Sequence, residues 1–476
     1  MSDFSISRPD APVPAQGGNG PATMLAADMH DPRHLPHADA ASHDEWPERL
    51  DAGVAALLVD TRWVAHLDRR PHEAVQAWQR TRLAALLTHA VRHSPWWRQR
   101  LAGLGGQITL AGLPVMSREE YRASIESVGG PLPLPPEHGS PIHEATSGSS
   151  GLPVEFYTSS LAKRLLEAEW RYDSLRQGRD PAALRAELAG RVPEHSGEHS
   201  GTKFHVVLGG GETLRRRLQQ FTFADHARWL SRIGPAYFST LPVALSAILD
   251  VYESGAVAPP RIAQVMTFAE TVDARLRQRT RSLLGAEIRD RYSCEEVGAI
   301  AFQCPHSEGH YHVASSNVVV EILDDEGRAC PPDTIGRVVV TGLHNHASPV
   351  VRYELNDLAA WQPRCACGRA APVLTKLLGR KRFLVRLPSG ERIALRLGAK
   401  EWLDVAPVRE HRLVQVSEDV LHVELVLDRP LTDMERQGIV AMLAREISPD
   451  LTYDIRQVER IDWAPTYKRQ DLVSLV

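Results

Sequence analysis

The residues best suited to chemistry stand together in one short run between Thr146 and Pro153. Its glycines allow backbone amides to approach an anion closely, and its hydroxyl groups add donors for phosphate oxygens. The residues that supply these groups are Thr146, Ser147, Gly148, Ser149, Ser150 and Gly151. No lysine closes the run, so it is not a GxxxxGK[ST] phosphate loop. The sequence therefore predicts a phosphate-binding loop of another kind, with a flexible serine- and glycine-rich linker as the alternative.

Acidic residues follow three stretches that we expect to be strands. Glu270 follows the first, Tyr292 and Glu296 end the second, and Asp357 follows the third. A carboxylate at the end of a parallel strand can hold Mg²⁺ against nucleotide phosphates, and a tyrosine there can stack on a base. Asp357 could accept hydrogen bonds from both hydroxyls of a ribose. Taken singly, each of these acids is more typical of a solvated loop.

A group of cysteine and histidine residues could bind a metal ion. Its members are Cys304, His306, His310, His312, Cys365 and Cys367. Three thiolates and one imidazole form a typical tetrahedral zinc site. The Cys-x-Cys spacing is tighter than the usual Cys-x₂-Cys, however, and the two halves lie far apart in the sequence. Ordinary free thiols are therefore an equally good interpretation. Near the C-terminus, Lys468 follows a proline-containing loop, where a lysine is usually solvated.

The elements that would position these residues change character along the chain. Helical periodicity covers residues 46–104 and 161–177, and Asp180-Pro181 is typical of the start of another helix that reaches towards Arg191. Residues 204–208 form an apolar run that predicts a buried strand. Ser117 and Glu120 have the spacing of a capping box at a helix start.

Between residues 236 and 292 strands and helices alternate regularly, which predicts a parallel sheet covered on both faces. Residues 318–323 and 336–342 then have the pattern of antiparallel strands. We expect a large α/β N-terminal domain of mixed or parallel sheets with helices and antiparallel strands, followed by a small mobile α+β C-terminal domain. The expected boundaries give a disordered leader at 1–45, the large domain at 46–379 and the small domain at 380–476.

The composition excludes several classes of protein. The chain has 476 residues, of which 43% are hydrophobic and 24% charged, as in ordinary globular proteins. A net charge of -4 gives no general attraction to nucleic acid or to an anionic membrane. No apolar run approaches the length of a membrane span, and the N-terminus lacks the pattern of a secretory signal, so we expect a cytoplasmic protein. The five cysteines are not spaced as a disulfide framework.

Taken together and in order, these motifs resemble those of the adenylate-forming enzymes, within the branch of phenylacetate-coenzyme A ligase and the CapK-like proteins. The resemblance covers roughly residues 78–470 and begins at the helix-like stretch from Arg80 to Pro95. It implies attack of a carboxylate on the α-phosphate of Mg·ATP, which gives an acyl-adenylate and pyrophosphate. The acyl group would then pass to the thiol of coenzyme A after the small domain rotates. The acid would be a small molecule, aromatic in many relatives, and the resemblance leaves room for a homodimer.

The resemblance also implies a role for each candidate residue. The loop from Thr146 would grip the phosphates, Glu270 would lie beside the adenine, and Tyr292 would stack on it. Glu296 would bind Mg²⁺, while Asp357 and Arg380 would reach the ribose. Lys468 would bridge the carboxylate and the α-phosphate, acting in catalysis together with Glu296 and Thr146. The same branch commonly holds a zinc ion, here at the positions Cys304, His312, Cys365 and Cys367.

The chain departs from the pattern of that branch at three places. Glu295 stands where a threonine or serine is usual, Lys381 to Phe383 lack the usual acids after the hinge, and Tyr467 replaces a glycine before Lys468. The basic hinge leaves open an amine or a carrier-protein thiol as the acyl acceptor instead of coenzyme A. A zinc-stabilised nucleotide-binding protein without catalytic activity is the alternative from a different class.

Overall fold

The structure is a computed structural model in which the chain forms two compact units. It describes residues 5–7, 52–104, 107–146, 154–189, 201–203, 211–270, 272, 274–380, 384–389, 392–394, 402, 404–461 and 472–476. The first unit comprises Met1–Thr146, Glu155–Glu354 and Ala359–Leu377. The second comprises Ser147–Val154, Leu355–Leu358 and Leu378–Val476.

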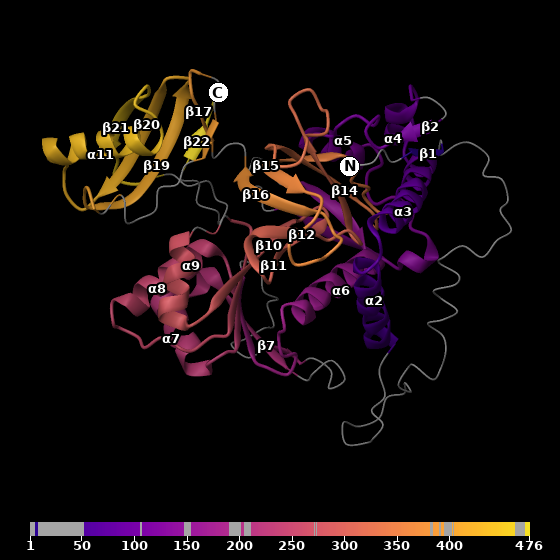
Figure 1. Cartoon of the computed structure of the whole chain (residues 1–476), viewed down its shortest axis with the longest axis horizontal. Coiled ribbons are helices and arrows are strands. Elements are labelled where there is room, and N and C mark those ends of the chain that lie inside the picture. Colours follow the sequence, from indigo (N-terminus) through magenta and orange to yellow (C-terminus); the bar gives the residue numbers. More distant parts are fainter. Residues whose placement is uncertain are drawn as a thin grey trace. The chain divides into compact units, whose positions relative to one another are not determined.

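The N-terminal part of the first unit is helical, as the periodicity predicts (Figure 1). Its elements are α2 (Ala52–Asp68), α3 (His72–His93), α4 (Pro95–Leu101) and α5 (Arg118–Glu126). The predicted capping box at the start of α5 is confirmed, with Ser117 and Glu120 each bonding the other's backbone amide. Strand β1 (Ser5–Ser7) pairs antiparallel with β2 (Gln107–Thr109). The expectation of a structureless leader is therefore wrong for these three residues, and the rest of 1–45 lies outside the described residues.

The main sheet has twelve strands in the order β13-β14-β15-β16-β12-β11-β10-β9-β8-β5-β7-β6. Its parallel part confirms the alternation predicted between residues 236 and 292. The strands concerned are β5 (Arg185–Ala189), β7 (Glu212–Arg217), β8 (Tyr237–Thr240), β9 (Gln264–Phe268) and the first five residues of β10 (Glu287–Cys294). The short β6 (Gly201–Lys203) pairs antiparallel with β7. The predicted strand at 204–208 lies outside the described residues.

The helix expected after Asp180-Pro181 is wrong. Pro181 begins a turn, and the chain then enters β5 in the middle of the parallel strands. Ala186 and Leu188 are buried on one face of this strand in the core of the sheet. Pairing with β7 on one side and β8 on the other satisfies the backbone of β5, and this tertiary pairing overrides the local helix-start signal.

Helices cover both faces of the parallel strands. One face carries α7 (Phe223–Ile233), α8 (Pro242–Glu253) and α9 (Ala274–Leu284), which lie together in Figure 1. Their apolar side chains form one buried cluster with side chains of β5, β7, β8, β9 and β10. The other face packs against α6 (Ser160–Arg176), whose Leu166 contacts Phe302 of β11 (Gly298–Cys304). Successive strand residues therefore face different helices.

The remaining strands of the main sheet extend it on the side of β10. They are β12 (Ser307–Val313), β13 (Val318–Leu323), β14 (Gly336–Gly342), β15 (Tyr353–Gln362) and β16 (Val373–Arg380). The predicted antiparallel pair at 318–323 and 336–342 is confirmed as β13 and β14. A separate hairpin pairs β3 (Pro141–Ala145) with β4 (Glu155–Ser159), after the short 3-10 helix Pro136–His138.

The second unit is the expected α+β domain. Four strands stand in the order β21-β20-β19-β22, and β17 (Leu384–Arg386) pairs with β18 (Arg392–Ala394). Helix α11 (Asp433–Glu446) packs Ile439, Met442 and Leu443 into a core shared with the sheet. The four strands are β19 (Val408–Ser417), β20 (Val420–Leu427), β21 (Thr452–Gln457) and β22 (Leu472–Ser474). A large α/β unit followed by a small α+β unit confirms the predicted fold class.

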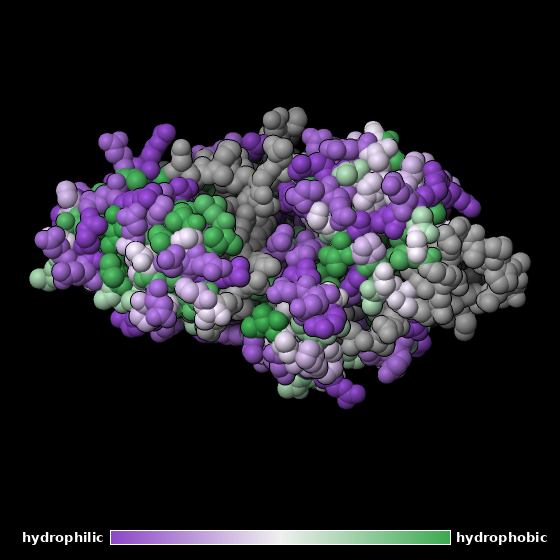
Figure 2. All heavy atoms as spheres, turned by 90° about the horizontal axis from the view of Figure 1, so that it is seen from above, coloured by the Kyte–Doolittle hydropathy of each residue, from purple (hydrophilic) through white to green (hydrophobic). Residues whose placement is uncertain are grey.

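One face of the molecule can be followed in the space-filling view. In Figure 2 the coloured surface is mostly hydrophilic, interrupted by small hydrophobic areas. Met434, Leu175 and Trp170 are among the exposed large hydrophobic side chains, at 82%, 57% and 42% exposure. Within the described part of the chain, every helix is too short or too polar to cross a bilayer.

Candidate active site

The end of β10 carries the candidate magnesium ligand. Glu296 lies in the turn between β10 and β11 and is buried, with 7% of its surface exposed. The hydroxyl of Tyr353, the first residue of β15, donates a 2.9 Å hydrogen bond to Glu296 Oε1. Burial raises the pKa of the Tyr353 phenol, and the neighbouring Glu296 carboxylate raises it further. Tyr353 is therefore a permanent donor that fixes one oxygen of Glu296.

A second tyrosine packs against Tyr353 close to this carboxylate. The ring of Tyr121, from α5, lies 5.4 Å from the ring of Tyr353 and is fully buried. Burial raises the pKa of Tyr121 as well, with Glu296 as the next contributor. The segment before α5 is tied to β15, because Met116 accepts a backbone hydrogen bond from Glu354 and donates one to Arg352. This tie sets the position of Tyr353 beneath Glu296.

The predicted phosphate loop joins two paired strands. Ala145, at the end of β3, pairs with Glu155, at the start of β4, so the run between them is a connection within a hairpin. Thr146 is buried and its hydroxyl accepts a 2.9 Å hydrogen bond from Arg118 Nη2. Ser147 to Pro153 lie outside the described residues, and with them Ser147, Gly148, Ser149, Ser150 and Gly151. The same Arg118 acts electrostatically on Tyr353, which places Thr146 in the neighbourhood of the Glu296 cluster.

Glu270 has a structural partner that the sequence did not indicate. Its Oε2 accepts a 3.0 Å hydrogen bond from the backbone amide of Val243, in the first turn of α8. A carboxylate at this position satisfies an unpaired amide of the helix and favours its dipole. The preceding residue, Ala269, has a φ of 70°, which is strained for a residue with a Cβ. Glu270 is thus held at the carboxyl end of β9, one strand away from Tyr292.

The other candidates for nucleotide binding lie in or near the second unit. Asp357 is partly buried in β15 and follows Asn356, whose φ is 59°. Arg380 is the last residue of β16. Lys468 lies outside the described residues. Local backbone strain before Asp357, as before Glu270, is a feature that clusters at functional sites in proteins.

The cysteine and histidine residues predicted to bind metal come together in the first unit. Cys304 ends β11, His312 lies on β12, and Cys365 and Cys367 lie between β15 and β16. One ligand atom from each of the four residues lies within 4.8 Å of all the others. The pairing of His312 with Val373 of β16 and Phe302 of β11 brings these distant segments together.

The distances in this cluster suit a zinc ion. Cys365 Sγ lies 3.9 Å from Cys304 Sγ, and Cys367 Sγ lies 3.3 Å from His312 Nε2. Tetrahedral Zn–S bonds of about 2.3 Å would place two sulfurs roughly 3.8 Å apart. Burial lowers the pKa of His312 to about 3, so its imidazole is neutral, as a metal ligand requires. The donor set and spacing therefore fit the group that the resemblance implies.

The other histidines and cysteines take different positions. His310 Nδ1 lies 3.3 Å from Cys365 Sγ, so it stands next to the cluster without belonging to it. The backbone amide of His306 donates to Cys304 Sγ. Cys330 is buried elsewhere, close to Gly336, where a Cβ would come within 2.6 Å of its sulfur.

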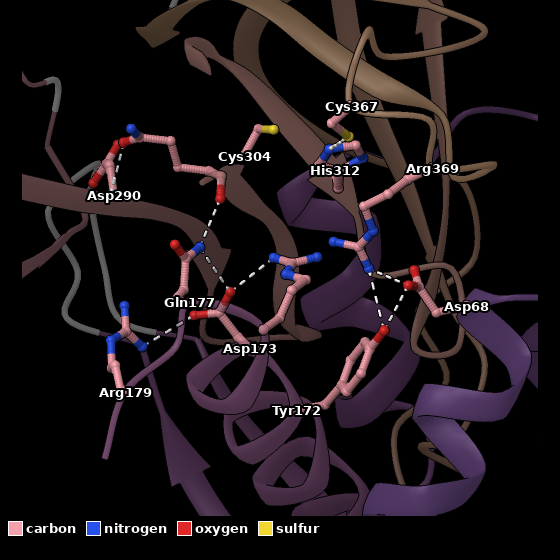
Figure 3. A network of polar contacts seen from close by, with 12 residues as sticks. Asp68, Tyr172, Asp173, Gln177, Arg179, Asp290, Cys304, His312, Cys367 and Arg369 are labelled. Carbon is pink, nitrogen blue, oxygen red and sulfur yellow. Dashed lines mark hydrogen bonds and ion pairs between the residues drawn. The ribbon is translucent and has the colours of Figure 1, made fainter. Parts of the chain in front are cut away.

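A polar network secures the loop that carries two of these ligands (Figure 3). Arg369, two residues beyond Cys367, donates to both Asp68 at the end of α2 and the hydroxyl of Tyr172 on α6. Tyr172 in turn donates a 2.7 Å hydrogen bond to Asp68. Nearby, Asp173 accepts from Arg176, Gln177 and Arg179. The cluster of cysteines and His312 is thus connected to the N-terminal helices through side chains with charge-assisted hydrogen bonds.

Sequence reasoning missed three residues of this site. Tyr353, Arg118 and Arg369 contact Glu296, Thr146 and Asp68 respectively, and each lies far in sequence from its partner. The sequence marks two of them only by their closeness to a motif, because Tyr353 precedes Asp357 and Arg369 follows Cys367. The partners become visible only once the strands are paired.

Comparison with solved structures defines the class of fold. A 2-hydroxyisobutyryl-CoA ligase, solved in the postadenylation state in complex with 2-HIB-AMP, superposes with a TM-score of 0.66 at 17% identity. The match covers 86% of this chain and 91% of that one. The chain therefore has the fold of the adenylate-forming CoA ligases.

Sequence comparison points to one branch of that class. A phenylacetate-coenzyme A ligase of Thermus thermophilus is 24% identical over 333 residues, covering 66% of this chain and 72% of the relative. The phenylacetate-coenzyme A ligase of Pseudomonas putida is 23% identical over 401 residues, covering 79% and 88%. No family profile matches the sequence. The resemblance to the phenylacetate-coenzyme A ligase branch that the motifs indicated is confirmed.

Proposed function

We propose that this protein is an ATP-dependent ligase that activates a carboxylic acid as an acyl-adenylate and transfers the acyl group to coenzyme A. The observation that carries the proposal is the buried Glu296 at the end of β10, held by Tyr353 in the fold of adenylate-forming ligases. Relatives named phenylacetate-coenzyme A ligase support the same reaction. The products of the first step would be the acyl-adenylate and pyrophosphate.

In this proposal the first unit binds the nucleotide through four described residues. Glu296 holds Mg²⁺, which neutralises phosphate charge, and the hydrogen bond from Tyr353 keeps one of its oxygens oriented. Thr146, positioned by Arg118, donates to the phosphates together with Ser147 to Gly151. Tyr292 stacks on the adenine and Glu270 lies beside it. The backbone amide of Val243 donates to Glu270, so Glu270 also fixes the start of α8 next to the proposed adenine site.

Three further residues have roles in the proposal. Asp357 and Arg380 bind the ribose, and Lys468 places its ammonium between the carboxylate and the α-phosphate. Two anions must meet in the adenylation step, so a positive charge at that point stabilises the transition state more than the separated reactants. Glu295 adds a negative charge next to Glu296 and would raise the affinity of this site for a divalent cation.

We further propose that Cys304, His312, Cys365 and Cys367 bind a structural zinc ion. The set supplies four protein ligands, three of them from buried residues, which is the pattern of a structural site rather than a catalytic one. Reduced thiolates as ligands suit a cytoplasmic location. The zinc would hold β11, β12 and the segment before β16 together.

Exchange of labelled pyrophosphate into ATP tests this function. The purified, zinc- and magnesium-replete protein is assayed with a panel of aryl, arylacetic and alkyl acids, and exchange that depends on the acid is the expected result. Formation of a thioester is then followed with coenzyme A, an amine and a carrier-protein thiol as competing acceptors. Absence of exchange with every acid, with ATP still bound, would instead identify a nucleotide-binding protein without catalytic activity. Thioester formation with coenzyme A alone excludes the other two acceptors.

A further inference from the structure

Arg291 is the last residue of β10 that pairs with the parallel strand β9, and it immediately precedes Tyr292. Its neighbours across the sheet are Phe268 on β9 and Phe302 on β11, and in paired strands such neighbours point to the same face. This is the face covered by α6, because Phe302 packs against Leu166 of that helix. Arg291 therefore points away from the face that holds Asp290 and α9.

Two aromatic rings flank the Arg291 guanidinium. Its central carbon lies 4.6 Å from the ring centroid of Phe268 and 5.5 Å from that of Trp170 on α6. Trp170 is 42% exposed, although its partner arginine is partly buried. A guanidinium flanked by rings keeps its edge free for hydrogen bonds, because the rings take its flat faces.

The acidic residues near Arg291 form hydrogen bonds with other residues. Glu187 accepts from Arg215 at 3.0 Å, and Asp173 accepts from Arg176 at 2.7 Å. Asp290, the preceding residue, accepts from Thr267 and Tyr311 on the other face. These three acids act on Arg291 only through longer-range electrostatics. Across the described ranges of the chain, Arg291 forms neither an ion pair nor a hydrogen bond through its side chain.

An arginine in this condition is unusual. Removing a guanidinium from water without a hydrogen-bonded partner is unfavourable, and structural arginines are normally paired. The partly buried Arg176 and the buried Arg179 of this region both bind Asp173. Arg289, two residues earlier on the same strand and face, is also partly buried and forms no side-chain hydrogen bond or ion pair with the described residues, but no described aromatic ring flanks it. A guanidinium that lies between aromatic rings and has no hydrogen-bonded partner is instead typical of an anion-binding site.

The position of Arg291 relates it to the proposed reaction. Phe268 precedes Glu270 by two residues, and Arg291 precedes Tyr292 by one, so both flank the proposed adenine site at the carboxyl ends of β9 and β10. Ligands of parallel sheets bind at this edge. A substrate whose carboxylate meets the nucleotide there would extend its far end towards the α6 face.

We infer that Arg291 binds a second anionic group on the acid substrate, so that the protein prefers planar or aromatic dicarboxylic acids over monocarboxylic ones. The rings of Trp170 and Phe268 would pack against the planar body of the substrate. The edge of the guanidinium would donate two hydrogen bonds to the oxygens of the distal carboxylate. This inference rests on the proposed function and adds a class of substrate to it. Arg291 would act in specificity, since the distal carboxylate takes no part in adenylation.

The test compares acids that differ only in the distal charge. Carboxyphenylacetate, its uncharged carbamoyl isostere and unsubstituted phenylacetate are assayed by pyrophosphate exchange, and their binding is measured by calorimetry with a non-hydrolysable ATP analogue. We expect the wild-type protein to favour the dicarboxylate over the isostere by roughly 10- to 100-fold in kcat/KM and in affinity, as for a charge-assisted hydrogen bond. Arg291→Met should abolish this ratio, and Arg291→Lys should keep part of it.

Arg289→Met is the matched control. Arg289 lies on the same strand and face, two residues further from the carboxyl end, and pairs across with Met266. Its replacement should leave the ratio between dicarboxylate and isostere unchanged, and thermal unfolding of both variants checks that they are folded. An equal preference for isostere and dicarboxylate in the wild type, or a ratio unaffected by Arg291→Met, would overturn the inference. Exchange with monocarboxylic acids would in that case still support the proposed ligase, whereas absence of exchange with all acids removes both.

Discussion

The Tyr353 hydroxyl donates a 2.9 Å hydrogen bond to Glu296 Oε1, across 57 positions of the sequence. Glu296 ends the β10 segment and Tyr353 begins β15, so the two meet only through the fold. Tyr353 is 3% exposed and its phenol stays protonated, because burial raises its pKa. The carboxylate proposed to bind Mg²⁺ therefore has one oxygen held in a fixed orientation by Tyr353.

Replacing Tyr353 by Phe should lower the affinity of the proposed magnesium site without leaving a cavity in the core. Hydrogen bonds that orient a metal ligand are typically worth about 10-fold or more in metal affinity, so we expect a similar fall in apparent Mg²⁺ affinity in pyrophosphate exchange. Tyr121→Phe is the matched control, since Tyr121 lies in the same aromatic cluster but its buried hydroxyl has no partner in the described structure. Equal magnesium dependence in both variants would show that the bond to Glu296 does not matter.

Replacing Lys468 by Ala should remove adenylation almost completely. A cation that stabilises charge only in the transition state is typically worth about 100-fold or more in rate. Pyrophosphate exchange should fall by that factor while ATP affinity changes little. The exposed Lys376 gives a control of the same type, and Lys376→Ala should retain exchange. Retention of full activity in Lys468→Ala would exclude the proposed role and favour a different cation.

Metal analysis should find one zinc ion in each chain. Cys365→Ser or Cys367→Ser should lower the zinc content and the unfolding temperature together, because zinc binding stabilises only the folded ligand set. Chelation of the wild type should have the same effect and should be reversed by added zinc. Cys330→Ala removes a buried thiol outside the cluster and should leave the zinc content unchanged. Full zinc content in both Cys365→Ser and Cys367→Ser would contradict the assignment.

Acid should destabilise the protein through two buried histidines that follow β14. Burial lowers the pKa of His344 and of His346 to about 4, below the ordinary value of 6.5. Between these values the unfolded chain binds protons that the folded chain does not, so stability is lost as the pH falls from about 6.5 to about 4. His138 and His89 flank His346, and the nearby Arg82 and Glu137 also act on it.

A variant separates this effect from other titrations. We measure by urea denaturation how far the free energy of unfolding falls between pH 7 and pH 4.5. The fall should be smaller in His346→Gln than in the wild type, by roughly 1–2 kcal/mol. Glu169 acts in the opposite direction, because burial raises its pKa to about 7 and its protonation favours the folded state as the pH falls. Parallel pH profiles for His346→Gln and the wild type would show that His346 does not contribute.

The sequence by itself determined the elements that local signals define. Pro242 at the first helical position and the capping box at Ser117 set helix starts that the structure reproduces. The alternation between residues 236 and 292 determined a parallel sheet, because each strand and helix there carries its own hydrophobic period. The order of motifs along the chain was enough to indicate the class of enzyme and the residues proposed for ATP.

Tertiary structure alone decided the features that depend on strands paired across long distances. Residues 185–189 form a strand instead of a helix because β7 and β8 satisfy their backbone. His312 comes close to the cysteines because it pairs with Phe302 of β11 and Val373 of β16, which places its Nε2 3.3 Å from Cys367 Sγ. Among the described residues Arg291 has no hydrogen-bonded partner, because Glu187, Asp173 and Asp290 bind other groups. A sequence records which charges exist, but hydrogen-bond partners are assigned by packing, and the absence of a partner is visible only when every neighbour is in place.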